Sequence, residues 1–418
     1  GPAGYSREVC RDRQGRFRCC AVARDHAATC SGGSVRCGHN MGSKQIVLRE
    51  NGYAGSKRQH DMVSVSYTYP FICIVFPESS PGREGDTEVK RRFAGALLMC
   101  SLLISAVGCS GTGKDLIADN ALYTGFALDG YPITVKRLAG LAGREGQQPD
   151  IVMFYLQWPS PADIDGAGFP SASVRAIRDT GALACITWEP MHIESGEEKT
   201  IPVSAVTNGA YDAYIRTFAR QAADYGNPVV VRFAHEMNIS RYHWGTLEKG
   251  YGSRSPGVYR ELFRYVVDLC RDEGGTNILW VFCPNAESAP APSEENATTW
   301  NTIHNYYPGG AYVDILGLDG YNWGFSRNKK EHGWTSRPQT FATIFEKPAR
   351  QIRKLAPQKP LIIFETASAG NTSEKSDWLS EAFKASTILD IHGIIWFQAD
   401  KETGWALPVD VFYGLRIR

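Results

Sequence analysis

Two glutamates in this sequence each follow a run of aliphatic and aromatic residues that is typical of a buried strand. Glu236 comes directly after the run Val229–His235, and Glu365 ends the run Leu361–Glu365. Catalytic side chains of parallel barrels lie at the carboxyl ends of the strands. A pair of such carboxylates can hydrolyse a glycosidic bond, one as acid and the other as nucleophile or base. For either glutamate alone, a helix cap or an ion pair with arginine is the alternative.

The chain around these glutamates alternates strand-like apolar runs with amphipathic stretches, as in a parallel sheet with crossover helices. Helical spacing of apolar residues is clearest over Tyr211–Tyr225 and Val258–Asp272. The candidate strands are Leu122–Leu128, Ile151–Trp158, Ala182–Trp188, Val229–His235, Ile278–Cys283, Val313–Asp319, Leu361–Glu365 and Gly393–Phe397. Eight such units predict an α/β fold of the (β/α)8 TIM-barrel type, with the active site at the carboxyl ends of the strands.

Side chains suited to binding a sugar recur at the ends of these strands. Aromatic rings stack on the C–H face of a pyranose, while carboxylates and amides bind its hydroxyl groups. The predicted substrate contacts are Trp158, Trp188, Glu189, His235, Asn238, Trp244, Tyr321, Trp323 and Trp396, and the predicted supporting residues are Arg232, Asn285 and Asp319. A single buried tryptophan is more often part of a core. The prediction therefore rests on the recurrence of these residues at corresponding strand ends.

Four stretches of the chain resemble glycoside hydrolase family 26, a family of retaining (β/α)8 glycosidases. They are Arg232–Asn238, Ile278–Asn285, Tyr307–Asn322 and Phe364–Thr366, within a resemblance that extends from Leu122 to Leu407. The resemblance implies that Glu236, which follows a histidine at the end of the fourth strand, is the acid/base. It also implies that Glu365 at the end of the seventh strand is the nucleophile, with Tyr321 beside it.

The physical chemistry of these positions agrees with those roles. Burial among apolar neighbours would raise the pKa of Glu236, whereas a hydrogen bond from the Tyr321 hydroxyl would favour an ionised Glu365. Asn238 is expected to bind the substrate's 2-hydroxyl group or to orient Glu236. Arg232, lower in the barrel, is expected to stabilise the carboxylates electrostatically.

Two departures from the family pattern fall where the sugar would sit. Mannan-cleaving members commonly follow His-Glu-Met-Asn with glycine and an aromatic residue, whereas Ile239–Arg241 follow here. On the third strand Glu189 follows Trp188, where many mannanases have a Trp-His pair, and this form is closer to the glucanases of the family. The prediction is a retaining endo-acting β-glycoside hydrolase with β-1,4-mannan as its default substrate. The alternatives are a mixed-linkage β-1,3-1,4-glucanase, an exopolysaccharide-trimming hydrolase of the same fold, and an inactive carbohydrate-binding barrel.

Charge and ligand spacing exclude other classes of function. The 45 Lys and Arg residues nearly balance the 44 Asp and Glu residues, so the sequence predicts no nucleic-acid partner. No set of His, Cys and carboxylate residues has the spacing of a metal site, and the prediction includes no metal and no cofactor. The expected partner is a β-linked polysaccharide or oligosaccharide.

The region before the barrel contains a segment typical of a bacterial lipoprotein signal. The basic residues Lys90–Arg92 precede the apolar run Phe93–Val107, and Gly108 and Cys109 follow this run. The prediction is a signal peptide over residues 89–109 that places a lipid on Cys109, a linker over 110–120 and a catalytic domain over 121–418. A short membrane anchor is the alternative for the apolar run.

Residues 1–88 are expected to be a disordered, non-native upstream extension, because a signal peptide must lead its chain. A genuine cysteine-rich domain is the alternative. The expected location is the bacterial cell envelope or the extracellular space, with the lipid on Cys109 as the only membrane contact.

Overall fold

The computed structural model of the protein describes residues 122–246 and 250–416, and before residue 122 it describes only six short strands. The chain divides into two compact units, Gly1–Val107 and Gly108–Arg418. The predicted signal segment 89–109, its Cys109 and the predicted linker 110–120 lie outside the described residues.

The described strands of the first unit pair two by two in antiparallel fashion. The pairs are β1 (Tyr5–Arg11) with β2 (Phe17–Ala23), β3 (Thr29–Cys30) with β4 (Gly33–Ser34), and β5 (Val63–Thr68) with β6 (Ile72–Pro77). These strands differ from the irregular chain expected for residues 1–88. The sequence of β5 alternates apolar and polar residues at its start, which is the period of a half-buried strand. The expectation of a non-native extension stays a prediction.

The second unit contains the closed parallel barrel that the sequence predicts. In chain order its strands are β7 (Tyr123–Leu128), β8 (Ile151–Gln157), β9 (Leu183–Glu189), β12 (Val229–Phe233), β13 (Ile278–Phe282), β14 (Ile315–Asp319), β15 (Leu361–Thr366) and β16 (Gly393–Phe397). Each strand pairs in parallel with the next, and β16 pairs with β7 to close the barrel. The (β/α)8 prediction is confirmed, and all eight carboxyl ends open at one end of the barrel.

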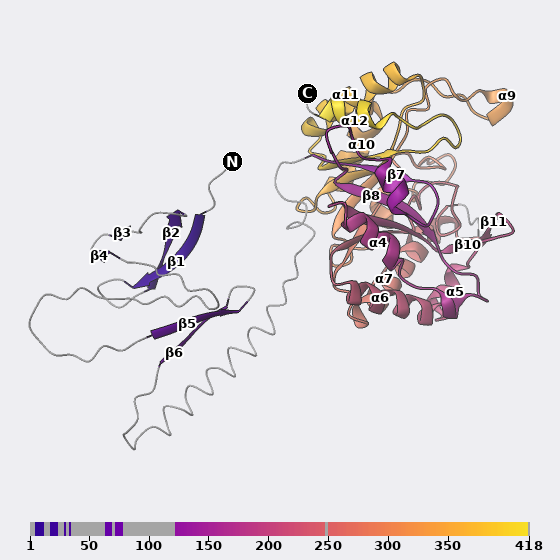
Figure 1. The fold of residues 1–418 in the computed structure, drawn as a ribbon. Coiled ribbons are helices and arrows are strands. Elements are labelled where there is room, and N and C mark those ends of the chain that lie inside the picture. Colours follow the sequence, from indigo (N-terminus) through magenta and orange to yellow (C-terminus); the bar gives the residue numbers. More distant parts are fainter. Residues whose placement is uncertain are drawn as a thin grey trace, which may run out of the picture. The chain divides into compact units, whose positions relative to one another are not determined.

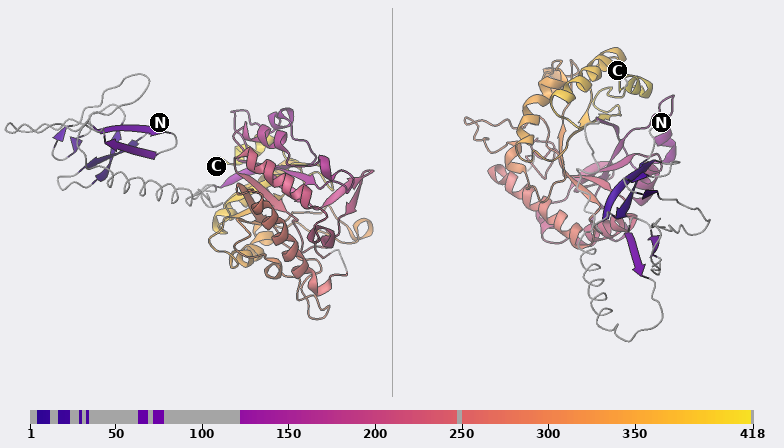
Figure 2. Two further views of the ribbon diagram at one scale, coloured as in Figure 1. Left: turned by 90° about the horizontal axis from the view of Figure 1, so that it is seen from below. Right: turned by 90° about the vertical axis from the view of Figure 1, so that its left-hand side faces the viewer.

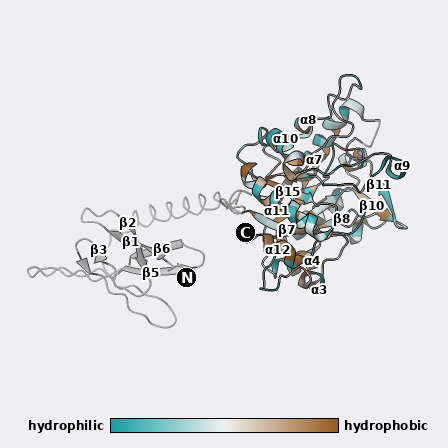
Figure 3. Ribbon diagram, turned by 90° about the horizontal axis from the view of Figure 1, so that it is seen from above, coloured by the Kyte–Doolittle hydropathy of each residue, from teal (hydrophilic) through white to brown (hydrophobic). Residues whose placement is uncertain are grey.

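Helices connect the strands and cover the outside of the barrel (Figures 1 and 2). They are α3 (Val135–Ala139), α4 (Ser171–Arg178), α5 (Val203–Thr207), α6 (Asp212–Tyr225), α7 (Ser255–Asp272), α8 (Ile303–Tyr306), α9 (Lys329–His332), α10 (Phe341–Arg353), α11 (Thr372–Ile388) and α12 (Val409–Arg416), with short turns η1 (Ile164–Gly166) and η2 (Gly252–Arg254). Hydrophobic and hydrophilic residues are mixed along the longer helices in Figure 3, because one face of each covers the strands, whereas α9 is polar and exposed. In the described part of the chain, no helix combines the length and the hydropathy needed to cross a bilayer.

An antiparallel hairpin extends the barrel after β9. It consists of β10 (Met191–Glu194) and β11 (Glu197–Thr200), joined by Ser195 and Gly196 with φ of 52° and 82°. Two consecutive residues in the left-handed region are typical of the tight turns that fit the twist of a hairpin. The hairpin and α9 lie on the same side of the barrel in Figure 1, and both follow the carboxyl ends of strands.

Candidate active site

The backbone after β12 takes an unusual path that presents Glu236. Ala234 and Glu236 have φ of 45° and 52°, in the left-handed region that residues with a side chain rarely adopt. Such conformations cost about 1–3 kcal/mol each and gather at functional sites. The Glu236 N–H donates to the Cys283 carbonyl at 2.8 Å. A Cβ atom on Gly245 would lie 1.9 Å from the Met237 carbonyl oxygen, so only glycine allows this close approach.

The carboxyl group of Glu236 is held in a buried, partly negative environment. The residue is 7% exposed, and Asn285 Nδ2 donates to its Oε1 at 2.6 Å. Burial disfavours the charged form, and the negative charge of Glu365 disfavours it further. Together they raise the pKa of Glu236 to about 7. A carboxyl group that keeps its proton near neutral pH can protonate a leaving group.

Asn238 acts on Glu236 through Asn285. Its Oδ1 accepts from the Asn285 backbone N–H at 2.8 Å, and its Nδ2 donates to the Asn285 carbonyl at 2.9 Å. Asn238 is fully buried, and its backbone carbonyl accepts a hydrogen bond from Asn301 Nδ2 at 3.0 Å. The expected contact with a substrate hydroxyl is therefore wrong, because this amide has no surface open to a ligand. The orienting role, which was the alternative, matches these contacts.

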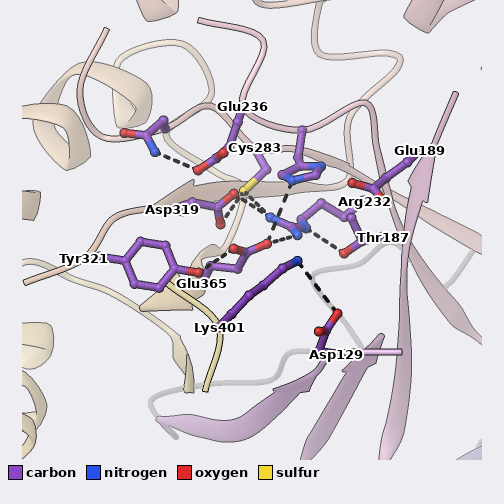
Figure 4. Close-up of polar contacts among 12 residues, drawn as sticks. Asp129, Thr187, Glu189, Arg232, Glu236, Cys283, Asp319, Tyr321, Glu365 and Lys401 are labelled. Carbon is purple, nitrogen blue, oxygen red and sulfur yellow. Dashed lines mark hydrogen bonds and ion pairs between the residues drawn. The ribbon is translucent and has the colours of Figure 1, made fainter. Parts of the chain in front are cut away.

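Glu365 lies at the end of β15 between a cation and a hydroxyl group. Arg232 forms an ion pair with Glu365 Oε1, and the Tyr321 hydroxyl donates to Oε2 at 2.6 Å. The hydrogen bond between Tyr321 and Glu365 is the one expected from the sequence. In Figure 4 the carboxylates of Glu236 and Glu365 face the same space, and Tyr321 flanks Glu365.

Arg232 connects three strands inside the barrel. Its guanidinium forms an ion pair with Asp319 as well as with Glu365, and its Nε donates to Thr187 Oγ1 at 3.0 Å. The Cys283 thiol lies 3.2 Å from the other oxygen of Asp319. A buried charge is stable only when its partners satisfy it, and here one cation faces two carboxylates. Arg232 and Asp319 thus occupy the supporting positions expected of them.

His235 packs beside Glu365 as an uncharged ring. Burial, and then the positive charge of Arg232, hold the pKa of His235 well below its usual range. Its Nε2 lies 3.9 Å from Glu365 Oε1, and its ring centroid lies 4.8 Å from that of Tyr242. His235, Asp319 and Glu365 bring ligand atoms within 4.8 Å of one another, the spacing of a metal site. The guanidinium of Arg232 already binds both carboxylates, so these donors serve an ion pair.

Glu189 is a third acidic group at the carboxyl ends of the strands. It ends β9, is buried, and accepts from Gln157 Nε2 at 2.5 Å. Burial raises the pKa of Glu189 to about 7, although the Gln157 hydrogen bond opposes this shift. Figure 4 shows Glu189 on the same side as Thr187 and Arg232. It is placed where the sequence predicts a polar substrate contact.

Four of the five predicted tryptophan contacts are wrong, because their side chains are buried, three against the outside of the barrel strands and Trp244 in the segment after β12. Trp188 stacks on Phe218 of α6 at 4.1 Å, and its Nε1 donates to Tyr214. Trp158 packs on Trp188, and Trp244 donates to the His235 carbonyl. The residues concerned are Trp158, Trp188, Trp244 and Trp396, each at most 2% exposed. Successive strand residues point to opposite faces, and Trp188 is out of step with the inward-facing Thr187 and Glu189.

Three further aromatic residues lie near the catalytic carboxylates, and of these only Trp323 was predicted from the sequence. Trp323, which was predicted, is half-buried and lies 6.1 Å from Tyr321. Tyr155 was not predicted, although it lies on β8 two residues before Gln157 and therefore points inward. Its ring lies 5.9 Å from the Arg232 guanidinium. Tyr242, also missed, is stacked on Trp244 at 4.4 Å, so its own ring is the one nearer the surface.

Comparisons with known proteins match the barrel and a region that contains part of the site. A family model described as "Glycosyl hydrolase family 26" matches residues 197–345, which include Glu236 and Tyr321. The chain is 28% identical over 323 residues to "Endoglucanase H" of Acetivibrio thermocellus, covering 76% of this chain and 32% of the relative. It is 32% identical over 108 residues to a "Mannan endo-1,4-beta-mannosidase" of Bacillus subtilis, covering 24% of this chain and 25% of the relative.

The chain therefore spans about a third of one relative's length and a quarter of the other's. A solved Bacillus subtilis mannanase structure has a TM-score of 0.50 at 16% identity, over 71% of this chain and 85% of that chain. This last likeness supports the barrel fold.

Proposed function

Because the chain belongs to glycoside hydrolase family 26, we propose that it is a retaining, endo-acting β-glycoside hydrolase that cleaves a β-linked polysaccharide. The observation that carries the proposal is the pairing of two carboxyl groups in contrasting surroundings. Glu236 keeps its proton near neutral pH, and Glu365 is bound by Arg232 and Tyr321. A double displacement needs one carboxyl group as acid and one as nucleophile.

In the first step Glu365 attacks the anomeric carbon while Glu236 gives its proton to the glycosidic oxygen, which leaves with the cleaved part of the chain. The product is a glycosyl ester on Glu365. In the second step Glu236, now ionised, takes a proton from water as the water attacks the same carbon. The ester breaks, Glu365 is regenerated, and the configuration of the sugar is retained. Two inversions at one carbon explain the retention.

The first prediction concerns pH. The acid must carry its proton, and the pKa of Glu236 is raised to about 7. We therefore expect kcat/KM for an oligosaccharide to fall as the pH rises through about 7, because the protonated fraction falls there. With an aryl glycoside whose leaving group needs no proton, formation of the intermediate should lose this dependence. Initial rates measured between about pH 5 and about pH 9 give the pH dependence for the oligosaccharide and for the aryl glycoside.

Glu189 is the matched control for this profile, because its pKa is also raised to about 7. Glu189→Gln keeps an acceptor for Gln157 and does not titrate. The alkaline fall in kcat/KM should persist in this variant. Loss of that fall in Glu189→Gln would assign the titration to Glu189 and contradict the role of Glu236.

The second prediction concerns Tyr321. Its hydroxyl donates to Glu365 at 2.6 Å, so Tyr321→Phe removes one contact and little volume. We expect kcat to fall by roughly ten to a thousandfold, the range for loss of one positioned donor, with little change in melting temperature. Tyr259→Phe is the control, since the buried Tyr259 hydroxyl has no hydrogen-bond partner among the described residues. Equal kinetics in the two variants would remove Tyr321 from the site.

For the substrate, we propose mixed-linkage β-glucan first and β-1,4-mannan second. The match to Endoglucanase H extends over 323 residues, whereas the match to the mannosidase extends over 108. Glu189, which is buried and accepts a hydrogen bond from Gln157, stands after Trp188 where many mannanases have histidine. These observations support mixed-linkage β-glucan, which was an alternative, over β-1,4-mannan, which was the default substrate expected from the sequence.

A hydrolysis screen tests this proposal. The protein is incubated with barley β-glucan, β-1,4-mannan and β-1,3-xylan, and the release of reducing ends and the product sizes are measured. Early products of many lengths support internal cleavage. If none of the three polysaccharides releases reducing ends, the proposed substrates are wrong, and an exopolysaccharide-trimming hydrolase and the inactive carbohydrate-binding barrel take their place.

We also propose that a lipid on Cys109 anchors the barrel at the bacterial cell envelope. The support is the sequence alone, with a basic head, an apolar run and small residues before the cysteine. Metabolic labelling with a radioactive fatty acid, compared between the protein and Cys109→Ser, tests this location.

A further inference from the structure

The segment between β14 and α10 exposes large aromatic side chains. It covers residues 320–340 and contains the short helix α9. Phe325 is 73% exposed and Trp334 is 45% exposed, while Trp323 is half-buried. Exposed aromatic surface is unfavourable in water, so its concentration in one segment indicates a binding surface. These three residues are called the distal aromatic platform below.

Polar contacts fix the shape of this segment. Asn322 Oδ1 accepts from the Gly324 and Gln339 backbone N–H groups at 3.1 and 2.9 Å, which brings the two ends of the segment together. The Arg327 N–H donates to Ser336 Oγ at 3.1 Å, and the Ser336 N–H donates to the Arg327 carbonyl at 3.2 Å. The platform is therefore carried by a loop that is closed on itself.

Ring contacts hold the aromatic side chains of the platform. Trp323 and Trp334 meet edge to face, with ring centroids 5.5 Å apart. The Arg327 guanidinium lies 4.5 Å from the Trp323 ring, and the Arg337 guanidinium lies 5.7 Å from the Phe325 ring. A ring that is already held loses little conformational entropy when a ligand stacks on it.

The platform is continuous with the catalytic residues. Tyr321, which donates to Glu365, lies 6.1 Å from Trp323. Trp405 packs under both, at 5.0 Å from Tyr321 and 4.9 Å from Trp323. An unbroken run of rings thus leads from the nucleophile to the exposed face of Trp334.

We propose that the distal aromatic platform binds sugar units of the β-linked polysaccharide at a distance from the bond that is cleaved, with Trp334 as its main contact. This inference rests on the proposed function, because the occupant is the same glycan chain that reaches Glu365. The C–H faces of β-linked pyranoses are apolar and flat, and they match exposed indole and phenyl rings. A short glycan that fills only the catalytic end would not reach Trp334, whereas a longer one would.

Calorimetric binding to an inactive protein tests the platform without depending on hydrolysis. In Glu236→Gln the Asn285 contact keeps its acceptor, so the site should keep its shape. In that background Trp334→Ala should weaken the binding of a β-1,4-mannan or mixed-linkage glucan hexasaccharide about tenfold, the effect of losing one buried aromatic contact. Binding of the matching disaccharide should be unchanged. Trp334→Phe should recover part of the hexasaccharide affinity.

Ile388→Ala is the control, because Ile388 is 83% exposed at the end of α11. It should change neither affinity. Equal hexasaccharide affinity with and without Trp334, or equal loss for both ligand lengths, would overturn the platform. So would sedimentation showing that Trp334→Ala converts a dimer to a monomer, since a second copy would then be the occupant. Release of reducing ends by the unsubstituted protein tests the hydrolase proposal independently of these binding measurements.

Discussion

Replacing Glu365 with alanine is expected to lower kcat on the polysaccharide by on the order of 10⁴-fold or more, as for other lost nucleophiles. Glu365 is the group that forms the bond to the sugar in the proposed mechanism, and Arg232 and Tyr321 hold its carboxylate in place. Rates of reducing-end release measure the effect. Glu346→Ala, on the outer surface of α10, should keep full activity because the Glu346 carboxylate is exposed and pairs with Arg350 of the same helix.

Azide identifies the reason for the loss. In Glu365→Ala the anomeric carbon has no nucleophile of the protein, so azide can attack it directly from the vacated side. Starting from a β-glycoside, one inversion gives the α-glycosyl azide. Proton NMR of the product reads its configuration. Formation of the β-glycosyl azide by this variant would contradict the role of Glu365 as nucleophile.

Replacing Glu236 with alanine is expected to lower kcat/KM on the polysaccharide by about 10²–10⁴-fold, the usual contribution of a positioned acid. An aryl glycoside with a good leaving group should still form the ester on Glu365, because its departure needs no proton. The ester should then accumulate, since no base activates water. Azide needs no base, so it should speed turnover and give the β-glycosyl azide.

The wild-type protein gives the matching stereochemical control. Hydrolysis of a β-linked oligosaccharide should first release the β-anomer, which proton NMR detects before mutarotation. Initial release of the α-anomer would contradict the double displacement for the whole site. Products of exchanged configuration in the two alanine variants would exchange the roles of Glu236 and Glu365.

The barrel could be predicted from the sequence because each strand is a short apolar run with a polar end. Strands that are buried on both faces do not alternate apolar and polar residues, so they appear in the sequence as continuous apolar runs. The distance between successive runs shows that helices lie between the strands. The same feature hid the direction of single side chains. Trp188 and Trp396 lie on the outward faces of β9 and β16, and Trp158 directly follows the inward-facing Gln157 at the end of β8. Counting alternate residues along each strand from an inward-facing residue would have shown these directions.

The supporting contacts depend on pairs of residues far apart in the chain. Asn285 donates to both Asn238 and Glu236. Asn238, which was expected to contact the substrate, therefore orients Glu236 indirectly through Asn285. The hairpin of β10 and β11 was missed, although Ser195 and Gly196 are typical turn residues. Tyr155 and Gln157 could have been found, because they share the inward parity of β8.

The contacts of Arg232 have a consequence for how such an enzyme can diversify. One guanidinium joins Thr187 of β9, Asp319 of β14 and Glu365 of β15, so any substitution among them disturbs folding and chemistry together. Mutations there are removed by selection before they can yield a new specificity. Heritable change in substrate preference must then begin outside this set of four residues, at Glu189, in the β10–β11 hairpin and in residues 320–340. We expect those positions to vary among descendants while Arg232 and its three partners stay constant.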